Sequence, residues 1–109
     1  MDYALDSNFD QERKRWSVSI VGEVDIFNSA DMKKSLTELI NQNNTDIVLD
    51  CKYLDYIDST ALGALVGVLK NVKSYGGSIY LRNVKPSLGK LFKITNLDKV
   101  FLIEGDGSE

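Results

Sequence analysis

The sequence predicts a single α/β domain, built on a mixed and mostly parallel β-sheet of four to five strands with helices packed mainly on one face. Two observations support this prediction. Short apolar runs alternate along the chain with longer segments whose apolar residues recur at helical spacing. The 109 residues, 43% of them hydrophobic, also match the size of one ordinary domain with a single core. We therefore expect the order β-β-α-β-α-β-α-β within one domain that spans residues 1–109.

The N-terminal residues predict a β-hairpin. Trp16, Val18 and Ile20 alternate with other residues, mostly polar, which is typical of a half-buried strand. Residues 3–9 form its weaker antiparallel partner, and the polar residues 11–14 provide the turn. We expect this hairpin to form one edge of the sheet.

An amphipathic helix follows the hairpin. Asn28 or Ser29 is suited to cap its N-terminus, and the polar residues 41–45 end it. Its apolar stripe consists of Met32, Leu36, Leu39 and Ile40. We expect this stripe to face the core.

Strands and helices alternate through the rest of the chain. Residues 47–51 form a buried strand, residues 78–82 another, and residues 100–103 a short strand or an extended tail. A central helix ends at the glycine pair 76–77, and a later helix occupies residues 86–94 and begins at a proline. The core stripe of the central helix comprises Leu62, Leu65, Val66, Leu69 and Val72. This alternation favours parallel strands joined by right-handed crossovers.

A serine at the start of the central helix is the most informative feature. Ser59 lies at a strand-to-helix turn, where a phosphate would meet free N–H groups and the positive end of the helix dipole. Loops that leave the carboxyl ends of parallel strands gather on one edge of the sheet, so residues 22–25 and 56–59 should be neighbours. Asp25, Asp58 and Ser59 then form one group of side chains from two loops.

The residue types that are missing exclude most enzyme classes. The chain has no histidine and only one cysteine, Cys51, which excludes Ser-His-acid hydrolysis, histidine-rich zinc sites and thiolate metal sites. A Ser-x-x-Lys dyad at Ser59 fails because Leu62 stands at the lysine position. We therefore expect a protein that is not an enzyme and that holds no cofactor or metal. Cys51 is interpreted as a small buried side chain, with a redox role as the alternative.

Charge and hydropathy also restrict the partners. The net charge is −3, the isoelectric point is near 4.9, and no dense block of Lys and Arg is present to neutralise a phosphate backbone. The longest apolar stretches are far shorter than the roughly 20 residues that cross a bilayer. We expect a cytoplasmic, unprocessed and monomeric protein with no membrane insertion and no direct contact with nucleic acid.

Three segments together resemble the anti-sigma factor antagonists, which are small stand-alone STAS-domain proteins. They are residues 22–25 (Gly-Glu-Val-Asp), 57–63 (Ile-Asp-Ser-Thr-Ala-Leu-Gly) and 88–94 (Leu-Gly-Lys-Leu-Phe-Lys-Ile). The resemblance covers nearly the whole chain and implies a STAS-type fold. In that family the serine directly after the motif aspartate is phosphorylated, and this position is Ser59. One departure is Ala61, where the family usually has glycine; alanine is nearly as small and a better helix former.

The resemblance implies a cycle of partner switching. Asp25 and Asp58 match the family's acidic residues beside the phosphorylation site. The unphosphorylated protein would bind an anti-sigma factor that is also a serine kinase, and would thereby release a sigma factor. Phosphate on Ser59 would break the complex, and a metal-dependent serine phosphatase would restore it. ATP and magnesium would belong to the kinase.

Structural roles remain open for each of these residues. Asp58, Ser59 and Thr60 are favoured as helix caps in any protein. Asp25 could simply end a strand and help to start the next helix. Opposite the apolar stripe of the central helix lies a face of small side chains, which consists of Thr60, Gly63, Ala64 and Gly67. Such a face lets another element approach closely, or it serves as a partner-binding surface beside Ser59; our hypothesis is the second.

Two other functions compete with the leading one. A STAS accessory or scaffold subunit of a transporter or signalling complex would need no phosphoacceptor at Ser59. A small nucleotide-binding domain or nucleotide hydrolase would need a Walker-type Gly-x-x-x-x-Gly-Lys-Ser/Thr loop, which the sequence lacks. The sequence therefore favours a regulatory protein whose ligand is a kinase.

Overall fold

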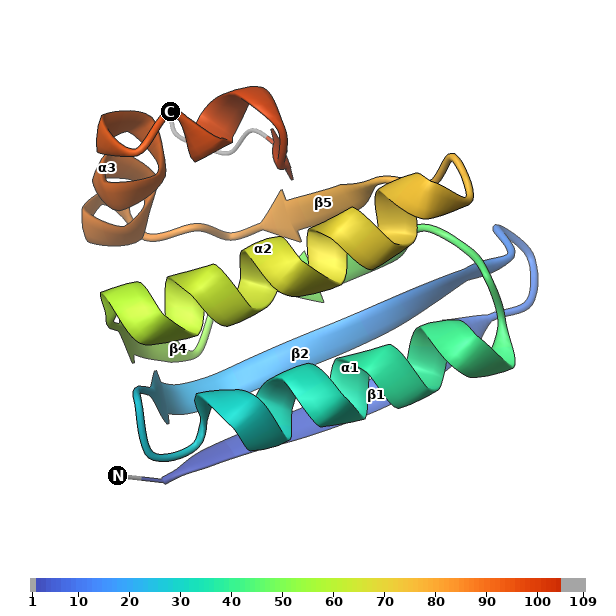
Figure 1. Ribbon diagram of the computed structural model, residues 1–109, viewed down its shortest axis with the longest axis horizontal. Coiled ribbons are helices and arrows are strands. Elements are labelled where there is room, and N and C mark those ends of the chain that lie inside the picture. Colours follow the sequence, from blue (N-terminus) through green and yellow to red (C-terminus); the bar gives the residue numbers. More distant parts are fainter. Residues whose placement is uncertain (1, 105–109) are drawn as a thin grey trace.

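A mixed sheet covered by helices on one face forms the domain, as seen in the computed structural model, which describes residues 2–104 (Figure 1). The strands are β1 (Tyr3–Asp10), β2 (Arg15–Val24), β3 (Ile47–Asp50), β4 (Leu54–Ile57), β5 (Ile79–Arg82) and β6 (Leu102–Ile103). The helices are α1 (Ser29–Gln42), α2 (Ser59–Ser74), α3 (Pro86–Ile94) and the short 3₁₀ helix η1 (Leu97–Lys99). The predicted α/β class and element order are confirmed, with β4 and η1 added.

The sheet has the order β1-β2-β3-β5-β6, and only the β1–β2 pair is antiparallel. Within the hairpin, Phe9 lies opposite Trp16, and their rings meet edge to face with centroids 5.1 Å apart. Trp16 is therefore a packing residue, as its alternating strand predicts. In the parallel part, Ile47 of β3 lies between Trp16 of β2 and Ile79 of β5.

Helices α1 and α2 lie side by side on the sheet, and α3 lies beyond β5 (Figure 1). The α1 stripe faces the core as predicted, with Leu39 half-buried at its margin. The stripe of α2 is wider than predicted, because this helix packs against α1 and shares the hydrophobic core with the sheet. Ala61 and Val68 are fully buried, whereas Val66 is only half-buried.

Strand β4 is the main addition to the predicted sheet of four to five strands; six are seen within residues 2–104. It pairs in parallel with the end of β2, next to a register shift between Gly22 and Glu23. Gly22 has a φ of +98°, and a Cβ there would lie 2.3 Å from the carbonyl oxygen of Asp2, so only glycine fits. Leu54 and Ile57 are the buried residues of β4; their spacing of three does not alternate, so periodicity does not reveal the strand.

Two further expectations from the sequence concern the role of Cys51 and the absence of a membrane span. Burial raises the pKa of the Cys51 thiol to about 12, so at neutral pH the group is a protonated, packed side chain. Among residues 2–104, none of the helices is both long and apolar enough to span a bilayer.

Candidate functional site

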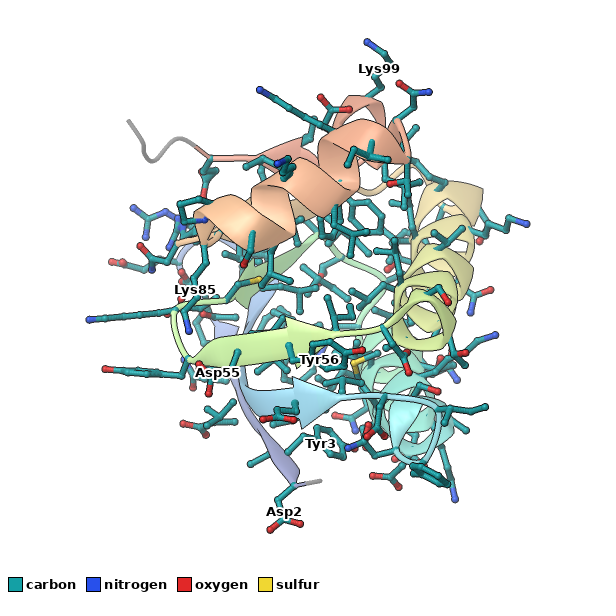
Figure 2. All side chains as sticks on the ribbon, turned by 90° about the vertical axis from the view of Figure 1, so that its left-hand side faces the viewer. Asp2, Tyr3, Asp55, Tyr56, Lys85 and Lys99 are labelled. Carbon is teal, nitrogen blue, oxygen red and sulfur yellow. The ribbon has the colours of Figure 1, made fainter. Side chains whose placement is uncertain are left out.

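The ends of β2 and β4 carry the candidate site, as the parallel topology predicts. Figure 2 shows the two strands ending next to each other, each leading into the start of a helix. The backbone N–H of Asp58 donates to the carbonyl of Val24 at 3.2 Å, which joins the end of one strand to the end of the other. The two loops that contain Asp25 and Ser59 are thus direct neighbours.

Asp25 organises the turn between β2 and α1. Its side chain is only 7% exposed, and Oδ1 accepts a hydrogen bond from the backbone N–H of Phe27 at 2.9 Å. Its own N–H donates to Oδ1 of Asn28 at 2.8 Å, and its carbonyl accepts from the N–H of Ser29 at 2.8 Å. The structural role considered for Asp25 is therefore present, and it holds the loop beside Ser59 in one shape.

Asp58 connects the two loops through its carboxylate. Oδ1 accepts from the backbone N–H of Ala61 at 2.8 Å and so caps α2, while Oδ2 accepts from the N–H of Ile26 at 3.0 Å. The helix-cap role considered for Asp58 is thus present in the structure. Because the same side chain also holds the loop of Ile26, Asp58 sets the position of both halves of the site.

Ser59 is the first residue of α2 and is exposed. Its hydroxyl makes no hydrogen bond to any residue within 2–104, so a partner protein can reach it without breaking an internal contact. The first N–H groups of a helix have no intrahelical acceptors, and Asp58 accepts only from that of Ala61. A phosphate on Ser59 therefore has backbone donors close by.

The face of small residues on α2 divides into two parts. At Gly63 an added Cβ would meet no atom within 4 Å, and Thr60, one turn earlier, is exposed. At Gly67 an added Cβ would lie 2.8 Å from Nζ of Lys33 on α1. Ala64 is half-buried. The N-terminal part of this face is therefore open, while the C-terminal part admits a side chain of α1. The packing role considered for this face applies at Gly67, and the partner-binding role stays a prediction.

Exposed apolar side chains beside Ser59 are the feature that the sequence analysis missed. Ile26 is 62% exposed and Phe27 is 90% exposed, on the loop that Asp25 and Asp58 hold in place. Tyr56, which is 47% exposed, lies on β4 just before Asp58 (Figure 2). A usable signal was present, because Ile26 and Phe27 are large apolar residues between a strand and a helix cap and belong to neither stripe.

The acidic side chains of the site are engaged by the backbone. Among the residues that the structure describes, no three His, Cys, Asp or Glu side chains are grouped so that they could hold a metal ion. The carboxylates of Asp25 and Asp58 accept backbone N–H groups, which is an organising role. The arrangement presents one serine hydroxyl, at a helix N-terminus, beside an exposed apolar loop.

Comparison with known proteins places this chain among relatives of similar sequence and fold. The chain is 39% identical over 83 residues to an anti-sigma-B factor antagonist of Bacillus subtilis (strain 168), a match that covers 76% of this chain and 75% of the relative. A crystal structure of a putative anti-sigma factor antagonist from Thermotoga maritima superposes with a TM-score of 0.79 at 25% identity, covering 94% of this chain and 86% of that one.

A third comparison concerns a phosphorylated protein of the same fold. The Bacillus cell fate determinant SpoIIAA in its phosphorylated form superposes with a TM-score of 0.70 at 20% identity, covering 94% of this chain and 93% of that one. The family profile described as "STAS domain" matches residues 11–107 of this chain. Since that match spans most of the sequence, this protein belongs to the STAS domain family.

Proposed function

We propose that this protein is an anti-sigma factor antagonist whose unphosphorylated form binds an anti-sigma factor and so releases a sigma factor. Phosphate on Ser59 ends that binding. The observation that carries the proposal is the free, exposed hydroxyl of Ser59 at the start of α2, beside the exposed loop of Ile26 and Phe27. The name of the Bacillus subtilis relative supports the same function.

The fold is expected to tolerate phosphorylation. Phosphate adds about −1.5 to −2 charges at neutral pH, and a helix N-terminus stabilises an anion by about 0.3–1 kcal/mol. Ser59 is exposed, so the phosphate stays in contact with water. Repulsion from the Asp58 carboxylate is reduced because both of its oxygens accept backbone N–H groups. Phosphorylation of Ser59 should therefore leave the domain folded.

The complex with the partner is expected to break, because its interface is fitted to a neutral hydroxyl. Mismatched or unpaired charges at a buried contact cost roughly 2–5 kcal/mol, which is a large share of an ordinary binding free energy. We assign the contact surface to Ser59, Thr60 and Gly63 on α2 and to Ile26 and Phe27 on the loop. Exposed aromatic side chains at the centre of such surfaces often dominate binding.

The group transfer itself is assigned to the partners. The anti-sigma factor would act as the serine kinase with ATP and magnesium, and a metal-dependent serine phosphatase would remove the phosphate. Asp25 and Asp58 act as the acidic neighbours that hold the acceptor loop. In this proposal the protein is a substrate and a binding partner in the cytoplasm, not an enzyme, and it does not contact nucleic acid.

The deciding experiment combines the protein with the candidate anti-sigma kinase and ATP. Mass spectrometry then locates the phosphate, and calorimetry measures complex formation for wild type, Ser59→Ala and Ser59→Asp. We expect phosphate on Ser59, tight binding by Ser59→Ala and loss of binding by Ser59→Asp. The matched control is Ser87→Asp, which changes an exposed serine in the first turn of α3 and should bind as wild type.

Two results would contradict the proposal. Absence of phosphate from Ser59 would remove the switch, and equal binding by Ser59→Asp and wild type would favour the accessory or scaffold function instead.

A second variant tests the contact surface: Phe27→Ala should weaken binding to the anti-sigma factor by roughly 30-fold, the value for a hot-spot residue. Ile94→Ala, which removes another exposed apolar side chain (71%) from α3, should have little effect.

A further inference from the structure

A groove lies along α2 from the middle of the helix to its C-terminal end, away from Ser59 at its start. It has a volume of about 490 Å³, within the roughly 300–1,000 Å³ range of small-molecule sites. Its walls are formed by Val66, Leu69, Lys70, Lys73, Ser74 and Val100. Five of these residues lie between the middle and the last residue of α2, and Val100 directly follows η1. Figure 1 shows the end of α2 in yellow and η1 in red. None of them belongs to the proposed phosphorylation site.

The groove combines an apolar surface with a cationic rim. Val66, Leu69 and Val100 provide the apolar part, and Val100 remains 41% exposed to solvent although it is a large hydrophobic residue. Lys70 and Lys73 are exposed, and neither forms an ion pair with a carboxylate among residues 2–104. Nζ of Lys73 donates to Oγ of Ser78 at 3.4 Å, a neutral acceptor that leaves its charge uncompensated.

We propose that this groove binds a free fatty acid, with the alkyl chain against the valine and leucine side chains and the carboxylate between Lys70 and Lys73. Burial of the chain removes apolar surface of both ligand and groove from water. The carboxylate supplies the negative charge that the two ammonium groups lack. The ligand thus matches the groove in both polarity and charge.

Other occupants fit the groove less well. A nucleotide base or a peptide backbone carries several donors and acceptors, and against this apolar surface they would remain unpaired. The polar side chains of the lining are Lys70, Lys73 and Ser74, all on one helix, so they can pair with one polar head but not with a polar body. An alkyl carboxylate needs only that one polar contact.

The test is a titration of the full chain with decanoate, kept below its micelle concentration and followed by ¹⁵N-HSQC spectra. We expect saturable shifts centred on Val66, Leu69 and Val100. Hexanoate should bind more weakly, because each methylene transferred from water contributes up to about fourfold in affinity. Decyltrimethylammonium, which has the same chain and a positive head, should not saturate the groove.

A pair of variants tests the role of the rim. The double variant that carries both Lys70→Glu and Lys73→Glu should bind decanoate about tenfold more weakly or worse, because two attractive charges become repulsive. The matched control is Lys90→Glu with Lys93→Glu on α3, which changes the net charge equally at exposed positions outside the groove and should bind decanoate within twofold of wild type.

The proposal is overturned by any of three results: no saturable binding of decanoate to the wild-type protein, shifts that map away from the groove, or equal binding by the two double variants. Circular dichroism confirms beforehand that each variant is folded. Since Ser59 lies at the start of α2, away from the groove, the outcome is independent of the phosphorylation proposal.

Discussion

At the scale of single residues, the Asp58 side chain links the two halves of the candidate site. One carboxylate oxygen caps α2 at Ala61 and the other holds the loop at Ile26. The Ser59 hydroxyl, on the next residue, makes no hydrogen bond to the part of the chain that the structure describes. The two neighbouring residues thus differ: the Asp58 side chain is engaged in the fold, whereas the Ser59 side chain is exposed.

Substitution of Asp58 should therefore cost stability. Asp58→Ala removes an N-cap, which typically costs about 0.5–2 kcal/mol, and also leaves the N–H of Ile26 without its acceptor. Asp58→Asn keeps one acceptor oxygen and should lose less. Urea denaturation measures both free energies of unfolding. If Asp58→Ala were as stable as wild type, the linking role assigned to this carboxylate would be wrong.

At the scale of secondary structure, α2 presents different surfaces along its length. Its N-terminal turns present Ser59 and Gly63, and Lys33 of α1 lies over Gly67 at its middle. The groove is lined by residues from Val66 to the end of the helix. One strip of apolar residues holds the helix on the sheet throughout. The surface of the helix is thereby divided among the proposed partner surface, a contact with α1 and the groove.

The two glycines of α2 should respond differently to substitution by glutamate. Gly63→Glu should abolish binding to the anti-sigma partner and leave the thermal unfolding temperature nearly unchanged, because its Cβ enters open space. At Gly67 the new side chain displaces the flexible end of Lys33. The unfolding temperature should therefore change more in Gly67→Glu than in Gly63→Glu. Calorimetry of binding and of unfolding measures both effects.

A glycine on another helix provides the control for this comparison. Gly89→Glu on α3 introduces the same side chain outside the proposed surface, where an added Cβ would make only an ordinary contact of 3.8 Å with Val84. It should retain partner binding. If Gly63→Glu bound the partner as well as Gly89→Glu does, the open face of α2 would not be the docking surface.

At the scale of the whole molecule, contacts between distant segments close the fold around the sheet. The phenol of Tyr3, on the edge strand β1, donates a hydrogen bond to Oδ2 of Asp31 in the first turn of α1. The C-terminal segment is held in a similar way, since the rings of Phe92 and Phe101 meet edge to face with centroids 5.4 Å apart. Both ends of the described chain are thus tied to helices.

The Tyr3 contact predicts a loss of stability at alkaline pH. Burial, followed by the hydrogen bond to Asp31 and its charge, raises the pKa of Tyr3 from 10.0 to about 12. The unfolded chain therefore releases this proton first, so the contribution is present below pH 10 and is lost as pH rises toward 12. Between pH 9 and pH 11 the free energy of unfolding should fall more for wild type than for Tyr3→Phe.

The comparison with Tyr3→Phe isolates this group from other alkaline titrations. Burial also raises the pKa values of Tyr75 and Cys51, but these groups are present in both proteins and their effects cancel in the difference. Denaturant unfolding at the two pH values gives the four free energies. Equal losses for wild type and Tyr3→Phe would show that the Tyr3 contact does not respond to pH.

Periodicity was sufficient to predict most elements, and topology was sufficient to predict that the loops of Asp25 and Asp58 meet. Periodicity did not predict β4, because its buried residues Leu54 and Ile57 lie three residues apart. This strand is recognisable only by its pairing with β2. Neither periodicity nor topology showed that the Asp58 carboxylate accepts a hydrogen bond from the backbone N–H of Ile26, because the two residues are 32 positions apart in the sequence.

The sequence by itself determined the α/β class, the order of the elements and the position of Ser59 at a helix start, because these depend on local spacing of apolar and capping residues. The tertiary structure decided which side chains remain uncovered. Phe27 is exposed while Phe101 is fully buried, and Gly63 is open while Gly67 lies under Lys33. Exposure depends on what packs against a residue from elsewhere in the chain, and local spacing carries no information on that.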